Sequence, residues 1–163
     1  MSFEQRLKDM GIELPPFGDG SAYYGVTYGK MKTHHITGNL LFLSGHTAGL
    51  DSAGAVRFPG RLGAGVTIEE GYAAARQTGL NCLAGIRHAL GSLDRVKGLV
   101  RSLNFVACAP DFVKPHLVVN GLTDLMADVF GDAAGIGGRA WIGVMSLADD
   151  YCFETWMTIE IEA

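Results

Sequence analysis

Residues 67–91 read TIEEGYAAARQTGLNCLAGIRHALG, the longest stretch of the chain with a single clear period. Thr67 and Glu70 have the spacing of a capping box, in which each side chain bonds the backbone N–H of the other residue. Gly91 follows the last periodic residue, as a glycine that ends a helix does. Between these ends, apolar and small residues recur at steps of four and three: Ile68, Tyr72, Ala75, Gly79, Leu83, Ile86 and Leu90. The stretch therefore predicts a long helix with one buried face.

Two further elements follow this helix along the chain. Residues 96–107 alternate between two sets of side chains, which favours a strand. Pro115 suits the first turn of a helix, and an apolar stripe then continues as far as Gly131. We expect a strand and a second helix that covers the same sheet.

Hairpins are predicted on both sides of this central part. Thr37-Gly38-Asn39 resembles a hairpin turn that leads into the buried run at residues 40–43. Residues 139–146 and 152–162 each alternate with period two and are spaced like the strands of a second hairpin. We also expect a short helix that starts after Ser2, a short strand at residues 55–58, and a mobile glycine-rich connection at residues 131–138.

The order hairpin, helix, strand, helix, hairpin predicts a two-layer α+β domain with a mostly antiparallel or mixed sheet. Two helices can cover only one face of that sheet. The other face is expected to carry Trp141 and Trp156, which favours self-association. Residues 1–32 are expected to form an N-terminal extension of short helix and arm, and residues 33–163 the domain itself.

Composition narrows the class of protein. A chain of 163 residues and 17.3 kDa is long enough for one domain with a full core. Hydrophobic residues make up 48% and charged residues 18%, which excludes a disordered chain. The net charge is −4 and the 13 Lys and Arg residues are scattered, so nucleic-acid binding is disfavoured.

The cysteines and the N-terminus bear on location. The three cysteines, Cys82, Cys108 and Cys152, show no C-x-x-C spacing, which favours a reduced compartment. The first ten residues carry four charges where a secretory signal has an apolar core, and no apolar run reaches 18 residues. We expect a cytoplasmic protein with no membrane association.

No strong catalytic motif is present, so chemistry has to be inferred from single residues. His34 and His35 are adjacent, and neighbours on a strand point to opposite faces, so a metal site is not expected. His46 directly follows Ser44-Gly45 at a strand end, where it is either a plain loop residue or part of a site. Nothing in the sequence indicates a cofactor.

Arg139 stands out among the basic residues. It opens a strand directly after a glycine-rich loop and shares a face with Trp141. A guanidinium at this place could bind a carboxylate in bidentate fashion. The alternative is a structural ion pair with Glu154 or Asp150 across the sheet edge.

From about Thr37 to its C-terminus the chain resembles the RidA/YjgF family, the reactive intermediate deaminases also described as endoribonuclease L-PSP proteins. The resemblance rests on several short motifs in matching order and spacing. They are Thr37 to Gly45, the region of Glu69-Glu70-Gly71 with Ala75-Arg76, Leu90 to Val96, Asp111-Phe112, Val119-Asn120, Val129 to Gly131, and Gly138-Arg139.

The resemblance implies a chorismate-mutase-like fold and a homotrimer with ligand clefts between subunits. It implies that Arg139 holds a substrate carboxylate, and that Ser44, Gly45 and Asn120 occupy the other binding positions. The chain departs from the family at the last-strand glutamate, which is Trp156 here. It also carries Trp141 for a usual cysteine, His46 for a usual glutamine and Met31 for a usual tyrosine.

These departures leave the reaction open. Hydrolysis of a 2-imino acid or enamine needs a carboxylate anchor, a positioned water and proton transfer near neutral pH. Arg139 supplies the anchor, and His46, Glu154 or Asp150 could replace the missing acid or base. Trp141 and Trp156 would line a drier, more aromatic cleft, which favours an apolar or aromatic carboxylate. Tyr23, Tyr24 or Tyr28 could reach the cleft from the N-terminal arm.

We therefore expect a RidA-like homotrimer that binds small carboxylates and hydrolyses imino acids if an acid/base group is in place. The alternative is a trimer that senses or binds ligands and has lost deaminase activity with the last-strand glutamate. A ribonuclease or translation inhibitor is the third reading and ranks low, because the acidic balance offers no basic track for RNA.

Overall fold

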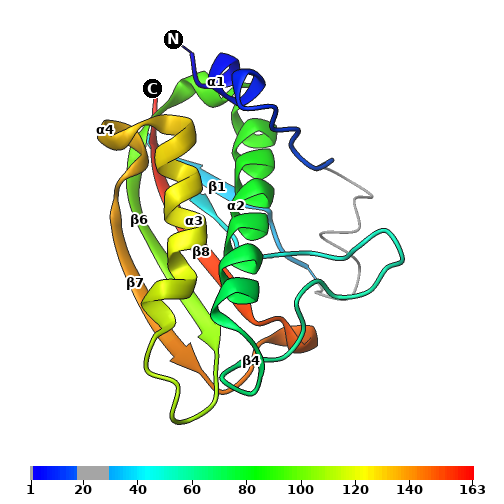
Figure 1. Ribbon diagram of the computed structural model, residues 1–163. Coiled ribbons are helices and arrows are strands. Elements are labelled where there is room, and N and C mark those ends of the chain that lie inside the picture. Colours follow the sequence, from blue (N-terminus) through cyan, green and yellow to red (C-terminus); the bar gives the residue numbers. More distant parts are fainter. Residues whose placement is uncertain (1, 18–29) are drawn as a thin grey trace.

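The computed structural model describes residues 2–17 and 30–163. Its elements in chain order are α1 (Phe3–Asp9), β1 (His34–Thr37), β2 (Leu40–Leu43), β3 (His46–Thr47), β4 (Arg61–Leu62), β5 (Gly65–Val66), α2 (Ile68–Leu90), β6 (Val96–Ala107), α3 (Pro115–Phe130), α4 (Asp132–Gly135), β7 (Gly138–Val144) and β8 (Phe153–Ile161). Helices α2 and α3 lie side by side over one face of the main sheet (Figure 1). The predicted two-layer α+β architecture is confirmed.

The two long helices begin and end where the sequence signals place them. Both hydrogen bonds of the capping box are present, from Glu70 N to Thr67 Oγ1 and from Thr67 N to Glu70 Oε2. Gly91 ends α2 in the left-handed conformation, with φ at 81°, which costs glycine least. Helix α3 starts at Pro115 and ends before Gly131, as expected.

The main sheet has the strand order β1-β2-β8-β6-β7, and β3 also pairs with β8. The hairpin of β1 and β2 is confirmed, with Gly38 and Asn39 at its turn. The C-terminal hairpin is a wrong prediction: β7 pairs parallel with β6, and β8 lies between β2 and β6. The reason is α3, which returns the chain to the starting end of the sheet, so that β6-α3-β7 forms a parallel crossover unit.

Two smaller features also differ from what the sequence predicted. The glycine-rich connection at residues 131–138 contains the one-turn helix α4, which the sequence did not predict. Gly135 there has no room for a side chain, since a Cβ would lie 2.3 Å from Met126 O. At residues 55–58 the structure shows a single bridge between Leu50 and Val56 in place of a strand.

Strand register divides the sheet into two faces. Paired residues share a face, so Trp141, Asn104 and Thr155 project toward the helices. The core lies on that side, and its largest fully buried side chains include Phe153, Leu83, Ile86, Leu122, Met157 and Ile159. The row of Ala140, Leu103 and Trp156 projects to the opposite face. None of the helices among residues 2–17 and 30–163 covers that face (Figure 1). We call this uncovered side the open face.

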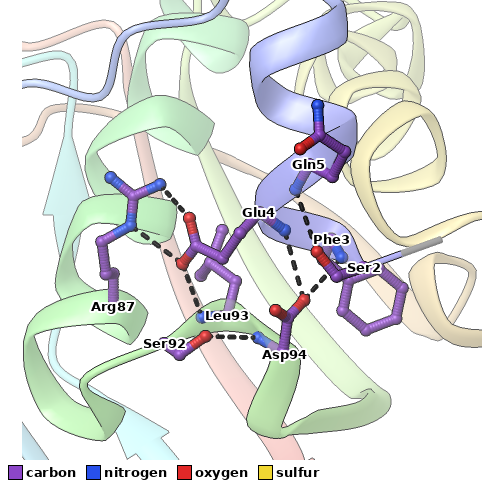
Figure 2. Close-up of polar contacts among 8 residues, drawn as sticks. All are labelled: Ser2, Phe3, Glu4, Gln5, Arg87, Ser92, Leu93 and Asp94. Carbon is purple, nitrogen blue, oxygen red and sulfur yellow. Dashed lines mark hydrogen bonds and ion pairs between the residues drawn. The ribbon is translucent and has the colours of Figure 1, made fainter.

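The N-terminal helix is fixed to the domain by polar contacts (Figure 2). Glu4 accepts hydrogen bonds from Arg87 at the end of α2 and from the backbone N–H of Leu93. Asp94 accepts from the N–H groups of Phe3 and Glu4, and so caps the start of α1. The short helix therefore folds as part of the domain. No helix in the described part of the chain is long and apolar enough to cross a membrane.

Candidate functional site

Four predicted site residues meet at one end of the open face. Ser44 and Gly45 form the turn between β2 and β3, and Glu154 and Trp156 project from β8 beside it. Trp156 Nε1 donates a hydrogen bond to Glu154 Oε1 at 2.7 Å. Ser44 Oγ donates to the carbonyl of Lys32, which ties the turn to the segment before β1. We call Ser44, Gly45, Glu154 and Trp156 the turn group.

Gly45 allows the carboxylate of this group to approach the backbone. A Cβ at this position would lie 2.3 Å from Glu154 Oε1 and 2.8 Å from Trp156 Nε1. Only glycine leaves that space free without moving both side chains. The indole therefore holds the Glu154 carboxylate against the turn, two residues along β8 from the place of the missing family glutamate.

A cavity of about 410 Å³ lies directly beside the turn group. Ser44, Gly45 and Trp156 form part of its wall, and Phe42 and Leu103 add apolar surface. Its volume is that of a pocket for a small molecule. It is open on one side, toward the uncovered face of the sheet, where Trp156 is 51% exposed.

The other predicted binding residues form a second cluster, between β7 and α3. Arg139 Nη1 donates to Thr123 Oγ1 at 2.7 Å, and its Cζ lies 5.4 Å from the centre of the Trp141 ring. Asn120 is one helical turn before Thr123 on the same face of α3. We call Asn120, Thr123, Arg139 and Trp141 the edge group.

The edge group leaves the guanidinium able to bind an anion. Thr123 occupies one N–H donor of Arg139, and a guanidinium has five. The stacking against Trp141 fixes the plane of the group. Neither Glu154 nor Asp150 forms an ion pair with Arg139 within residues 2–17 and 30–163. The structural ion pair considered from the sequence is therefore absent there.

The two clusters lie on opposite sides of the sheet. Trp141 pairs with Asn104 and faces α3, whereas Trp156 pairs with Leu103 and faces outward. The expectation that both tryptophans lie on the uncovered face is therefore corrected for Trp141, and one chain does not place both in one cleft. A site that uses Arg139 and Glu154 at once has to combine the edge group of one copy with the turn group of another.

The expectation that His46 serves as an acid or base is wrong for this fold. His46 pairs with Thr155 on the core side of the sheet, and its ring is 0% exposed. Nδ1 donates to Ser44 O at 2.6 Å, and the ring stacks on Phe17 at 6.0 Å between centroids. Burial lowers the pKa of His46 to about 4, and the hydrogen bond to Ser44 only partly opposes this. His46 is thus a neutral core residue.

This burial predicts a specific dependence of stability on pH. Between its ordinary pKa of 6.5 and about 4, His46 is protonated in the unfolded chain but neutral in the folded one. The free energy of unfolding should therefore fall as the pH decreases through this window, by roughly 3 kcal/mol from this residue alone. His46→Gln, which restores the usual family residue and can still donate to Ser44 O, should remove most of that decrease. Urea unfolding at pH 7.5, 6, 5 and 4.5 measures it, with His35→Gln on exposed β1 as the control.

The cysteines and the possible metal ligands add no further site among residues 2–17 and 30–163. All three cysteines are free, and burial raises the pKa of Cys152 to about 12 and that of Cys82 as well, so these two thiols are unreactive. Among the described residues, no group of three or more His, Cys, Asp or Glu side chains could hold a metal ion. Tyr23, Tyr24 and Tyr28, expected near the cleft, lie outside the described residues.

The sequence analysis missed one residue of the edge group and one residue of the neighbouring cavity. Thr123 is three positions after Asn120, so helical spacing alone could have placed it beside Arg139. Arg101 also lines the cavity, because it pairs with Thr158 on the open face. Only the register between β6 and β8 shows this, and no residue pattern in the sequence fixes that register.

Comparison with known proteins agrees with this fold. Residues 4–157 match the family described as "YjgF/chorismate_mutase-like, putative endoribonuclease". Protein TCP17 of Trypanosoma cruzi is 35% identical over 155 residues, which are 95% of this chain and 91% of that protein. Atu1372 of Agrobacterium tumefaciens, of unknown function, is 32% identical with a TM-score of 0.83, covering 98% of this chain and 94% of that one.

Two further solved structures share the fold. A "putative endoribonuclease" of Shewanella oneidensis MR-1 is 27% identical with a TM-score of 0.86, covering 99% of this chain and 100% of that one. E. coli TdcF, solved with bound serine, is 16% identical with a TM-score of 0.55, covering 83% and 90%. At the last identity the likeness is one of fold.

Proposed function

The chain belongs to the YjgF/chorismate mutase-like family, and we propose that it binds small carboxylates in clefts formed between two copies of the chain. The observation that carries this proposal is the state of Arg139. Thr123 and Trp141 hold its guanidinium in place, and no Asp or Glu forms an ion pair with it in the described part of the chain. A fixed guanidinium with free donors binds a carboxylate through two parallel hydrogen bonds.

The second half of the site is the turn group of a neighbouring copy. The open face carries exposed apolar side chains, among them Phe42, Ile142 and Trp156, which water would otherwise contact. Burying this face against other copies, as in the homotrimer that the RidA resemblance implies, joins the edge group of one copy to the cavity of the next. Trp141 and Trp156 would then line the same cleft from two subunits.

The size and lining of the cavity set the class of ligand. About 410 Å³ with walls of Phe42, Leu103 and Trp156 suits a small acid with an apolar part. TdcF, which shares only the fold, was solved with serine, which is also a small carboxylate. We therefore propose 2-oxo acids and amino acids of three to six carbons as ligands.

Hydrolysis of 2-imino acids is a second candidate, and one contact favours it. The carboxylate that accepts the hydrogen bond of Trp156 Nε1 lies against the Ser44-Gly45 turn. Glu154 at that place can position a water and accept its proton, while Arg139 of the neighbouring copy holds the substrate carboxylate. If Glu154 does not act in this way, the protein is a ligand-binding or sensing trimer without turnover.

Ribonuclease activity is not proposed for this chain. The net charge of −4 gives no extended basic surface for a phosphate backbone, and the basic residues are scattered along the sequence. Retention on single-stranded RNA at 150 mM salt would reverse this conclusion.

The binding proposal is tested by titrating 2-oxopentanoate into the full-length protein by calorimetry. Arg139→Gln should weaken binding about 100-fold, because it replaces a bidentate charged contact by a single neutral donor. Arg61→Gln, at an exposed residue of β4 that belongs to neither cluster, is the control and should bind like the wild type. Light scattering should give the same oligomer for all three proteins. Unchanged affinity in Arg139→Gln, or no binding by the wild type, would refute the proposed site.

A further inference from the structure

The cavity beside the turn group carries basic side chains that the proposed function does not use. Lys32 and Arg101 both line it, together with His35, and among residues 2–17 and 30–163 no Asp or Glu is part of its lining. This local excess of positive charge stands against a net charge of −4 for the whole chain. A concave surface with one sign of charge concentrates ligands of the opposite sign.

The position of Arg101 follows from the strand register. His35 pairs with Phe42, Phe42 with Thr158, and Thr158 with Arg101, so these residues form one row across β1, β2, β8 and β6. All four project to the open face, and strands lie about 4.8 Å apart. Arg101 is therefore next to Thr158 on the cavity floor, and the next row on the same face holds Leu103 and Trp156.

Arg101 has no acidic partner to neutralise it within the described ranges. Glu160 is the acidic residue diagonal to it on β8, but its carboxylate accepts a hydrogen bond from Asn39 Nδ2 at 3.2 Å. Glu154, on the other side of Trp156, is held by the indole. The two ion pairs seen among residues 2–17 and 30–163 join Arg76 to Asp128 and Arg87 to Glu4.

We propose that the cavity binds a second anionic group of the ligand, through Arg101 with Lys32, so that the preferred ligands are dicarboxylates. This inference rests on the proposed function, in which Arg139 of a neighbouring copy holds the first carboxylate. The apolar stem between the two charged ends lies against Phe42 and Trp156, which line the same cavity. The ligand thus has one carboxylate at each end of a short chain.

The test compares 2-oxoglutarate with 2-oxopentanoate, which has the same five carbons but lacks the second carboxylate. The wild type should bind 2-oxoglutarate about 10-fold more tightly in calorimetry, since one further charged hydrogen bond is made at a partly exposed site. Arg101→Gln should remove this preference and leave the affinity for 2-oxopentanoate within about twofold of the wild type. Lys32→Gln should reduce the preference in part, and Lys97→Gln, an exposed control on β6, should leave it intact.

The outcomes separate this inference from the proposed function. If both acids bind equally tightly and Arg139→Gln abolishes their binding, only the second subsite is overturned. The second subsite is also overturned if Arg101→Gln keeps the preference for 2-oxoglutarate. Dissociation of the oligomer in Arg101→Gln would overturn it as well, because Arg101 would then belong to the contact between subunits. Binding of both acids that is indifferent to Arg139 would overturn the proposed function instead.

Discussion

Replacing Gly121 by alanine should prevent helices α2 and α3 from packing at their present distance. A Cβ on residue 121 would lie 2.0 Å from Tyr72 O and 3.1 Å from Arg76 N, both of which are backbone atoms of α2. Backbone atoms within a helix cannot rotate away as a side chain does, so the two helices would have to separate. The core between them contains Leu122, Leu125 and Met126, all fully buried, which would lose their contacts.

The expected cost is about 4 kcal/mol in the free energy of unfolding, at the upper end of what overpacking does. Urea unfolding followed by circular dichroism measures it, at equal protein concentration because assembly adds to apparent stability. Gly98→Ala is the matched control, since a Cβ there meets nothing closer than Ala134 O at 3.7 Å. It should change stability by less than about 1 kcal/mol. Equal stabilities for the two variants would show that α2 and α3 do not approach as closely as described.

The same helices show what the sequence could predict. The capping box at Thr67 predicted the start of α2, and the glycines after Leu90 and Phe130 predicted the ends of α2 and α3. These signals are local and act within one turn of the helix. The alternation at residues 96–107 likewise predicted a strand. The close approach of the helices at Gly121 could not be predicted, because a glycine inside an apolar stripe does not indicate which residue it will contact.

Strand pairing was the part that local pattern could not decide. Two period-two segments near the C-terminus resemble a hairpin whether they pair with each other or not. The strand-helix-strand order of β6, α3 and β7 does predict a parallel pair, since a crossover of this length returns the chain to the same end of the sheet. That rule accounts for the parallel pair of β6 and β7, whereas the place of β8 between β2 and β6 follows from no local pattern.

The faces of the two tryptophans could not be predicted for a related reason. Both were expected on the uncovered face of the sheet, but the faces depend on the pairing of Trp141 with Asn104 and of Trp156 with Leu103. A shift of register by one residue reverses every side chain of a strand, so the face cannot be known before the register. His46 was misplaced in the same way, because its pairing with Thr155 turns the ring into the core.

Glu154→Gln should abolish turnover of freshly generated 2-imino acids while leaving ligand binding nearly unchanged. Glutamine keeps an oxygen that can accept the hydrogen bond from Trp156 Nε1, so the side chain stays against the Ser44-Gly45 turn. It cannot accept a proton from water at neutral pH. Loss of a general base typically lowers the rate by 10² to 10⁴, and we expect about 1,000-fold here. Ammonia release measures the rate, and calorimetry with 2-oxopentanoate measures binding.

Two further variants determine whether the carboxylate acts by its charge or by its position. Glu160→Gln removes a carboxylate from the same face of β8, three rows of the ladder away from Glu154, and should keep full turnover. Trp156→Glu in the Glu154→Gln background places a carboxylate where the active deaminases of the resembled family have theirs, and should restore part of the rate. If Glu154→Gln keeps wild-type turnover, Glu154 is not the base. If the wild type itself releases no ammonia while Arg139-dependent binding is intact, the protein binds its ligands without turnover, and the indole at the place of the family glutamate accounts for the missing reaction.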